Sequence, residues 1–168
     1  MLQKSRARKP NITTTRTGIR PMITLVFAAA CAGIFCGASL YVNLVEHPAR
    51  MSCGTELAVR EFAPSYQRAT VMQASLALAA LLFGLAAAWR ASDGIVAVAA
   101  VLLGAVVPFT LVVILPTNRQ LLDQSLDRNS ARARALLGRW NRLHAVRSVL
   151  SAVAFALFLW RLALRAKG

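Results

Sequence analysis

The two histidines of the sequence each lie among polar residues at helical spacing, and these side chains are the best suited to chemistry. Asn43 precedes His47 by four positions and Arg147 follows His144 by three, so each pair shares one face of a helix. A neutral imidazole can act as a general base, and a guanidinium or amide group can stabilise an oxyanion. We therefore predict two halves of a site, in the stretches YVNLVEHPAR and WNRLHAVR.

Three more side chains accompany these two halves. Asn118 follows Pro116 at the end of an apolar run, and Trp140 and Asn141 lie about one helical turn before His144. The predicted catalytic residues are His47, His144, Arg147 and Asn118, and the predicted substrate-binding residues are Asn43, Trp140 and Asn141.

A metal site is an alternative use of the two histidines. Two imidazoles with a carboxylate can bind iron, copper or zinc, and two axial histidines can bind haem. The sequence has no HxxxH, ExxH or CxxC pair within one helix and no motif for an organic cofactor. The cofactor is therefore unknown, with metal and haem both open, and His47 and His144 are the candidate metal ligands.

The composition indicates a membrane protein. Hydrophobic residues make up 57% of the 168, and 20 Lys and Arg against 6 Asp and Glu give a net charge of +14. The basic residues lie mainly in the tails and one loop, which favours anionic lipid headgroups over nucleic acid as the partner. Each of four apolar runs has the roughly 20 residues that a spanning helix needs. The runs cover about 22–45, 70–89, 94–115 and 145–164.

These runs predict an all-α fold, an integral membrane four-helix bundle. Four spans place both long connections on one side of the membrane, together with both histidines. Leucines recur at near-helical intervals among charged residues between spans three and four, which predicts an amphipathic interfacial helix there. Pro64 is expected to break a shorter amphipathic piece between spans one and two, and Pro108 to kink the third span.

The chain divides into a basic tail, residues 1–20, which we expect to be disordered, and a transmembrane domain, residues 21–168. Lys and Arg are balanced between the two sides when all are counted, and the basic cluster of the tail directly precedes the first span. Because the first span usually dominates orientation, we expect a bacterial inner-membrane protein with both termini in the cytoplasm.

Four segments together resemble a known family. They are NLVEHPAR at the end of the first span, YQRATVMQ opening the second, ILPTNRQL ending the third and LLGRWNRLHAVRSVLS opening the fourth. The pattern, from about residue 22 to 164, resembles the DUF1772 (anthrone oxygenase-like) family of small four-span membrane proteins. Some members look like oxygenases that install a quinone oxygen on polycyclic anthrones without a classical organic cofactor. The positions that match the motifs are His47, Asn118, Trp140, His144 and Arg147.

Two functions stay open at this point. The resemblance implies a membrane oxygenase acting on a small hydrophobic substrate, phenolic or polycyclic, in which a base forms a carbanion that reacts with O₂. The alternative is a non-catalytic accessory subunit of a larger membrane complex. Gly33 and Gly37 in the first span have the GxxxG spacing that lets a partner helix approach closely.

Overall fold

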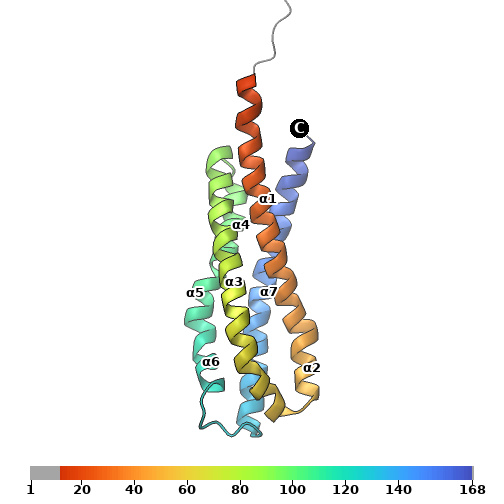
Figure 1. The fold of residues 1–168 in the computed structure, drawn as a ribbon, viewed down its shortest axis with the longest axis vertical. Helices are drawn as coiled ribbons and strands as arrows, with labels where there is room; N and C mark the ends of the chain where they lie inside the picture. The colour runs from red at the N-terminus through yellow and green to blue at the C-terminus, as the bar shows by residue number, and fades with distance from the viewer. Residues whose placement is uncertain (1–11, 168) are drawn as a thin grey trace, which may run out of the picture.

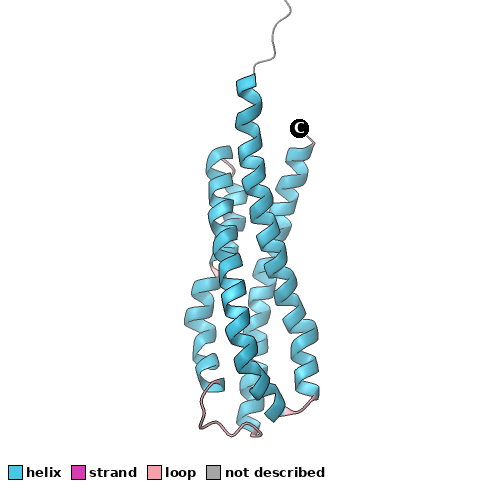
Figure 2. Ribbon diagram, in the orientation of Figure 1, coloured by secondary structure: helices cyan, strands magenta, loops and turns pink. Residues whose placement is uncertain are grey.

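The chain folds into helices, and the computed structural model describes residues 12–167, with side chains from residue 22 onward. No strand occurs among these residues, which confirms the predicted all-α class. Figure 2 shows that only short loops connect the helices. The elements are α1 (Ile12–Tyr41), the π-helical segment η1 (Val42–Glu46), α2 (His47–Ser52), α3 (Thr55–Ala91), α4 (Gly94–Gly104), α5 (Val106–Phe109), the π-helical segment η2 (Thr110–Ile114), α6 (Leu115–Leu121) and α7 (Ala131–Ala166).

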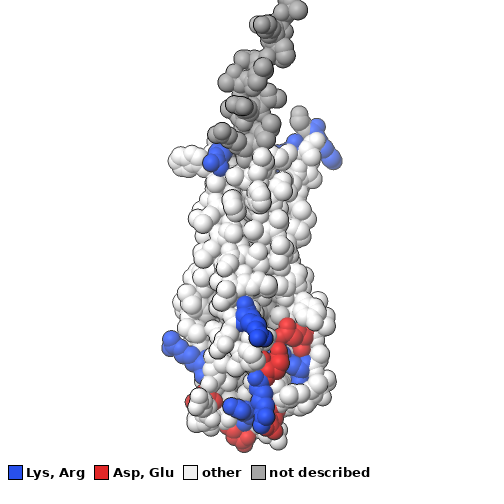
Figure 3. Space-filling model, in the orientation of Figure 1, with Lys and Arg blue, Asp and Glu red and all other residues white. Residues whose placement is uncertain are grey.

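Four helical stretches are long and apolar enough to cross a membrane, which confirms the predicted four-span bundle. They lie side by side in an elongated bundle, with the start of α1 and the end of α7 at the same end (Figure 1). On the face shown in Figure 3, an uncharged belt separates the charged groups at the two ends. The spans are Met22–Ser52, Thr55–Ala91, Gly94–Leu121 and Ala131–Ala166.

The long connections differ from the prediction, because they are mostly extensions of the spans. No separate interfacial helix lies between spans three and four in the described chain: α6 continues the third span, α7 already starts at Ala131, and only 122–130 is non-helical. Three of the leucines that suggested this helix, Leu121, Leu136 and Leu137, are buried together in a core cluster; Leu126 packs partly against it, and Leu122 is exposed. The helical spacing is correct, but the buried leucines pack within the bundle instead of lying on the bilayer surface.

The helix ends differ from the prediction in two other places. α3 runs without a break through Pro64, which is exposed. Buried side chains before this proline, Ala58 and Phe62, hold the first turns of α3 against the bundle, and such packing outweighs one lost hydrogen bond. Most of the predicted tail, residues 1–11, lies outside the described residues, and α1 begins at Ile12.

The core of the bundle towards the two termini is built from small residues. Ala28, Ala32 and Ala77 are completely buried there. A Cβ added to Gly33 would lie 2.9 Å from Cε2 of Phe155 on α7, whereas one added to Gly37 would meet nothing within 4 Å. Gly33 therefore allows close packing of α1 against α7 inside the bundle. That a partner helix binds at the GxxxG row stays a prediction, and Gly37 is the glycine that is free for it.

Asp93 ties the hairpin between the second and third spans to the end of the fourth. Its Oδ2 accepts hydrogen bonds from Nε of Arg161 and Nη2 of Arg165, both at 2.8 Å, and its Oδ1 caps α4 at the backbone N–H groups of Ile95 and Val96. Burial alone would raise the pKa of Asp93. The two guanidinium hydrogen bonds and the backbone N–H of Val96 more than offset this effect and hold the pKa below its usual value of 3.8.

Asp93→Asn is expected to lower the free energy of unfolding by about 2 kcal/mol, because it weakens two charge-assisted hydrogen bonds to a buried carboxylate. Because the pKa of Asp93 is lower in the folded protein than in the unfolded chain, the carboxylate contributes its full stabilisation at pH values above the unfolded pKa. This stabilisation is lost as the pH falls through the folded pKa. Melting in detergent at several pH values measures both effects. Glu56→Gln removes the exposed pair with Arg60 and is expected to change little; equal losses in both variants would contradict the assignment.

Candidate functional site

A polar cavity lies within the half of the bundle that carries the long connections. Its free volume for water-sized molecules is about 30 Å³, which is room for a molecule of the size of water or dioxygen. Residues from all four spans line it, so only the folded bundle creates it. The lining residues are Val42, Glu46, Arg50, Phe62, Ser65, Tyr66, Ala69, Thr70, Gln73, Asn118, Trp140, His144 and Arg147.

Two π-helical segments shape the first and third spans at this level. Each is followed within two residues by a proline, Pro48 after η1 and Pro116 after η2. A proline has no N–H, and its ring clashes with the carbonyl four residues earlier. Those carbonyls belong to Leu44 and Val112, inside the two segments, where a wider turn relieves the clash. η1 in turn sets the direction of Asn43, and π turns of this kind are frequent at functional sites.

Asn43 fixes the tautomer of His144. The Nδ2 group of Asn43 donates to the backbone carbonyl of Asn141 at 3.1 Å and to its side-chain Oδ1 at 2.7 Å. A carbonyl can only accept, so the other end of the Asn43 amide is the oxygen. This oxygen accepts from the Ser148 hydroxyl at 2.5 Å and lies 2.9 Å from Nδ1 of His144. In the neutral ring Nδ1 must therefore carry the proton, and Nε2 of His144 is the nitrogen with the lone pair.

The indole ring of Trp140 lies between the two histidines and packs against both; we call it the aromatic floor of the site. Its ring centroid lies 4.8 Å from that of His144 and 6.0 Å from that of His47, and Phe62 packs against it edge-on at 5.3 Å. Both histidines are buried. They share Trp140 as a neighbour, no hydrogen bond or ring-ring pair joins them in the described structure, and His47 is not among the residues that line the cavity.

Arg147 points into the bundle and does not extend along the helix to the membrane surface. Its Nη2 donates to Oε1 of Gln73 at 2.6 Å, and its guanidinium carbon lies 5.5 Å from the ring centroid of Phe35. Its Nε is buried without a hydrogen-bond partner among the described residues. Charges within a span usually face a polar interior, and here Arg147 borders the cavity.

Asn118 is the least satisfied polar side chain of the site. It is 0% exposed, and neither its Oδ1 nor its Nδ2 has a hydrogen-bond partner within the described part of the chain. Buried amides are almost always hydrogen-bonded. Because Asn118 also lines the cavity, its free amide is available to a polar group bound there.

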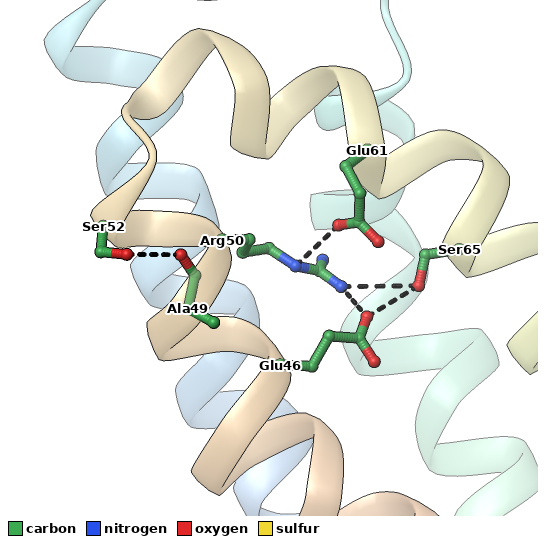
Figure 4. A network of polar contacts seen from close by, with 6 residues as sticks. All are labelled: Glu46, Ala49, Arg50, Ser52, Glu61 and Ser65. Carbon is green, nitrogen blue, oxygen red and sulfur yellow. Dashed lines mark hydrogen bonds and ion pairs between the residues drawn. The ribbon is translucent and has the colours of Figure 1, made fainter.

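A charged network closes the loop side of the cavity. Figure 4 shows Arg50 reaching between two acids: its Nε lies 2.8 Å from Oε2 of Glu61, and its Nη2 pairs with Glu46. The Ser65 hydroxyl donates to Oε1 of Glu46 at 2.9 Å. Arg50 is buried and also lies over Trp140, with its guanidinium carbon 5.9 Å from the ring centroid. This network joins the first two spans next to the site.

The structure thus brings together most of the predicted site. Four predicted residues line the cavity, while Asn43 and Asn141 support one of them and His47 lies against the aromatic floor. The residues predicted for the site did not include Gln73, Arg50 or Ser148. Gln73 is a lone amide within an apolar run, Arg50 ends the polar stretch YVNLVEHPAR, and Ser148 directly follows WNRLHAVR, so each had a signal in the sequence. Among the described residues, no three His, Cys, Asp or Glu side chains lie together so that they could hold a metal. The four lining residues are Asn118, Trp140, His144 and Arg147.

The fold and the site define a four-span membrane protein with a polar cavity that is lined by a histidine, an amide and a guanidinium group. The family model described as anthrone oxygenase matches residues 62–157, more than half of the chain, and the chain belongs to this family. The matched region includes all four lining residues named above but not Asn43 or His47. Comparisons with curated proteins and with solved structures gave no match.

Proposed function

We propose that this protein is a membrane oxygenase that oxidises a small hydrophobic phenolic or polycyclic substrate at the polar cavity. The observation that carries the proposal is the pairing of Asn43 with His144, which leaves Nε2 of a cavity-lining imidazole free to accept a proton. Asn118 and Arg147 line the same cavity and can donate to an oxygen on which negative charge develops. A general base and an oxyanion site therefore lie within one small space.

For an anthrone, the chemistry balances with O₂ as the only co-reactant. Nε2 of His144 takes a proton from the methylene carbon, and the electron pair left behind spreads to the carbonyl oxygen, near Asn118 and Arg147. The carbanion transfers electrons to O₂ and bonds to it, and the peroxide formed takes up the proton. Loss of the second methylene proton and cleavage of the O–O bond give a second carbonyl group and water. One anthrone and one O₂ thus become one anthraquinone and one water.

The same proposal assigns a location. The start of α1 and the end of α7 lie at one end of the bundle (Figure 1), and the polar cavity is lined by residues of the other half, among them Glu46, Ser65 and Asn118. With the termini in the cytoplasm of a bacterium, the polar cavity lies towards the outer half of the inner membrane. The basic residues of the N-terminal tail support this orientation, because such residues are retained on the cytoplasmic side.

The test is turnover by the purified protein in lipid nanodiscs supplied with anthrone and ¹⁸O₂. We expect saturable formation of anthraquinone, one ¹⁸O in each product and one O₂ consumed per anthrone. Elemental analysis and an absorption spectrum of the same preparation determine whether a metal or haem accompanies the protein. Product formation no faster than in empty nanodiscs would overturn the proposal.

A further inference from the structure

A second cavity lies beside the polar one, on the flank of the bundle between α3 and the third span; we call it the flank cavity. Its free volume for water-sized molecules is about 70 Å³, more than twice that of the polar cavity. Its walls are mainly apolar and include Phe35, Ala74, Ala77 and Val107. Such apolar walls bind hydrocarbon and aromatic groups.

The flank cavity reaches the lipid-facing surface. Thr70 on α3 and Leu111 on η2 both line it, and both are exposed on the outside of the bundle. Both residues belong to segments that are apolar enough to span the membrane. A hydrophobic molecule dissolved in the bilayer therefore meets this opening without crossing the aqueous phase.

The two cavities share one wall. Thr70, Gln73 and Arg147 line both of them, and the 2.6 Å hydrogen bond from Arg147 to Gln73 lies at their boundary. Arg147 has a buried Nε without a partner in the described structure, and Asn118 on the polar side has an unpartnered amide. Hydrogen-bond donors for an oxygen atom thus lie at the boundary between the two cavities. The flank cavity on one side is apolar, and the polar cavity on the other side is lined by His144, the proposed base.

We infer that the flank cavity binds the apolar ring system of the substrate, which enters from the bilayer between α3 and the third span. The hydrogen bond between Gln73 and Arg147 acts as the gate. When it opens, Arg147 turns from Gln73 to the oxygen substituent of the ring system, and the two spaces join. This inference rests on the proposed function for the identity of the ligand, a fused-ring phenol or ketone.

The opening to the lipid allows these small cavities to bind part of a substrate that is larger than both of them. The polar cavity alone has room for dioxygen but not for fused rings. In this binding mode part of the ring system lies among the apolar side chains of the flank cavity, next to Phe35, and the rest extends through the opening towards the lipid. The reactive carbon then faces the polar cavity, which His144 lines. Arg147 lies over Phe35 at the junction and holds the oxygen at the border between the two environments.

The test is direct binding of 1-hydroxyanthraquinone, a probe that resembles the product. Trp89 and Trp160 are 89% and 50% exposed, so replacing both by phenylalanine leaves Trp140 as the reporter with little loss of packing. In nanodiscs, we expect saturable quenching of Trp140 by the probe. Ala74→Phe, which fills the flank cavity, is expected to raise the Kd at least tenfold. The matched control is Ala156→Phe, an exposed alanine on α7, which is expected to leave the Kd within twofold.

Val107→Phe fills the same cavity from the opposite wall and replaces Ala74→Phe if that variant does not fold. A Kd unchanged in the filled variants, or no saturable quenching, would overturn the inference. Anthrone turnover is measured separately. If the protein turns over anthrone but the filled variants bind the probe normally, this inference is wrong and the proposed function stands. If the filled variants lose probe binding but the protein shows no turnover, the proposed function is wrong and the flank cavity is still a binding site.

Discussion

His144→Ala is expected to lower kcat for anthrone oxidation by a factor of about 100 to 10,000, the usual range for the loss of a general base. Asn43 holds the Nδ1 proton of His144 and leaves Nε2 as the free acceptor in the wall of the cavity. The measurement is the initial rate of oxygen uptake in nanodiscs. Added imidazole is expected to restore part of the activity, because the missing ring leaves space next to the cavity. A purely structural role for His144 would give no such rescue.

His47→Ala is the matched comparison for this prediction, and it tests the catalytic role that the sequence also predicted for His47. Its ring is also buried against Trp140, but it is not among the residues lining the polar cavity. We expect a loss of less than tenfold and no rescue by imidazole. Unchanged turnover in His144→Ala would contradict the role of the base, and equal losses with equal rescue in both variants would contradict its assignment to His144 alone.

The four spans could be predicted from the sequence because crossing a membrane requires long apolar runs, whatever their partners are. The ends of these helices could not. Leu136 and Leu137 show the periodicity of an amphipathic helix, and the same pattern fits a helix on the bilayer or an extension packed against α6. Only the tertiary packing decides between these two arrangements.

The same limit applies to the site. The histidines and Arg147 stand out because polar residues near or within a span are costly, and this signal survives in the sequence alone. The roles of their neighbours depend on contacts over large separations. Asn43 and His144 are 101 positions apart, and Gln73 and Arg147 are 74 apart. The π turn that directs Asn43 has a local signal in Pro48, but that signal does not state which residue Asn43 will meet.

Asn118→Leu is expected to raise the stability of the protein while it removes activity. The Asn118 side chain is completely buried, and neither end of its amide has a partner among the described residues. An unsatisfied buried polar group costs about 1–3 kcal/mol, so an apolar side chain of similar size should raise the melting temperature. Loss of one oxyanion donor typically lowers kcat by a factor of about 100 to 1,000. Thermal melting and oxygen uptake on the same preparation measure both effects.

Thr117→Val separates these two effects, because Thr117 is the neighbour of Asn118 and has a buried Oγ1 that also lacks a partner in the described structure. The Thr117 side chain is completely buried but is not among the residues lining the polar cavity. Its substitution should therefore stabilise the protein with kcat within twofold of the wild type. A lower melting temperature in Asn118→Leu would mean that the amide is satisfied in the resting protein. Full activity in that variant would mean that the oxyanion is held by Arg147 without Asn118. Stabilisation with loss of activity in Asn118→Leu, but not in Thr117→Val, would identify an unpaired amide kept for binding the substrate's oxygen.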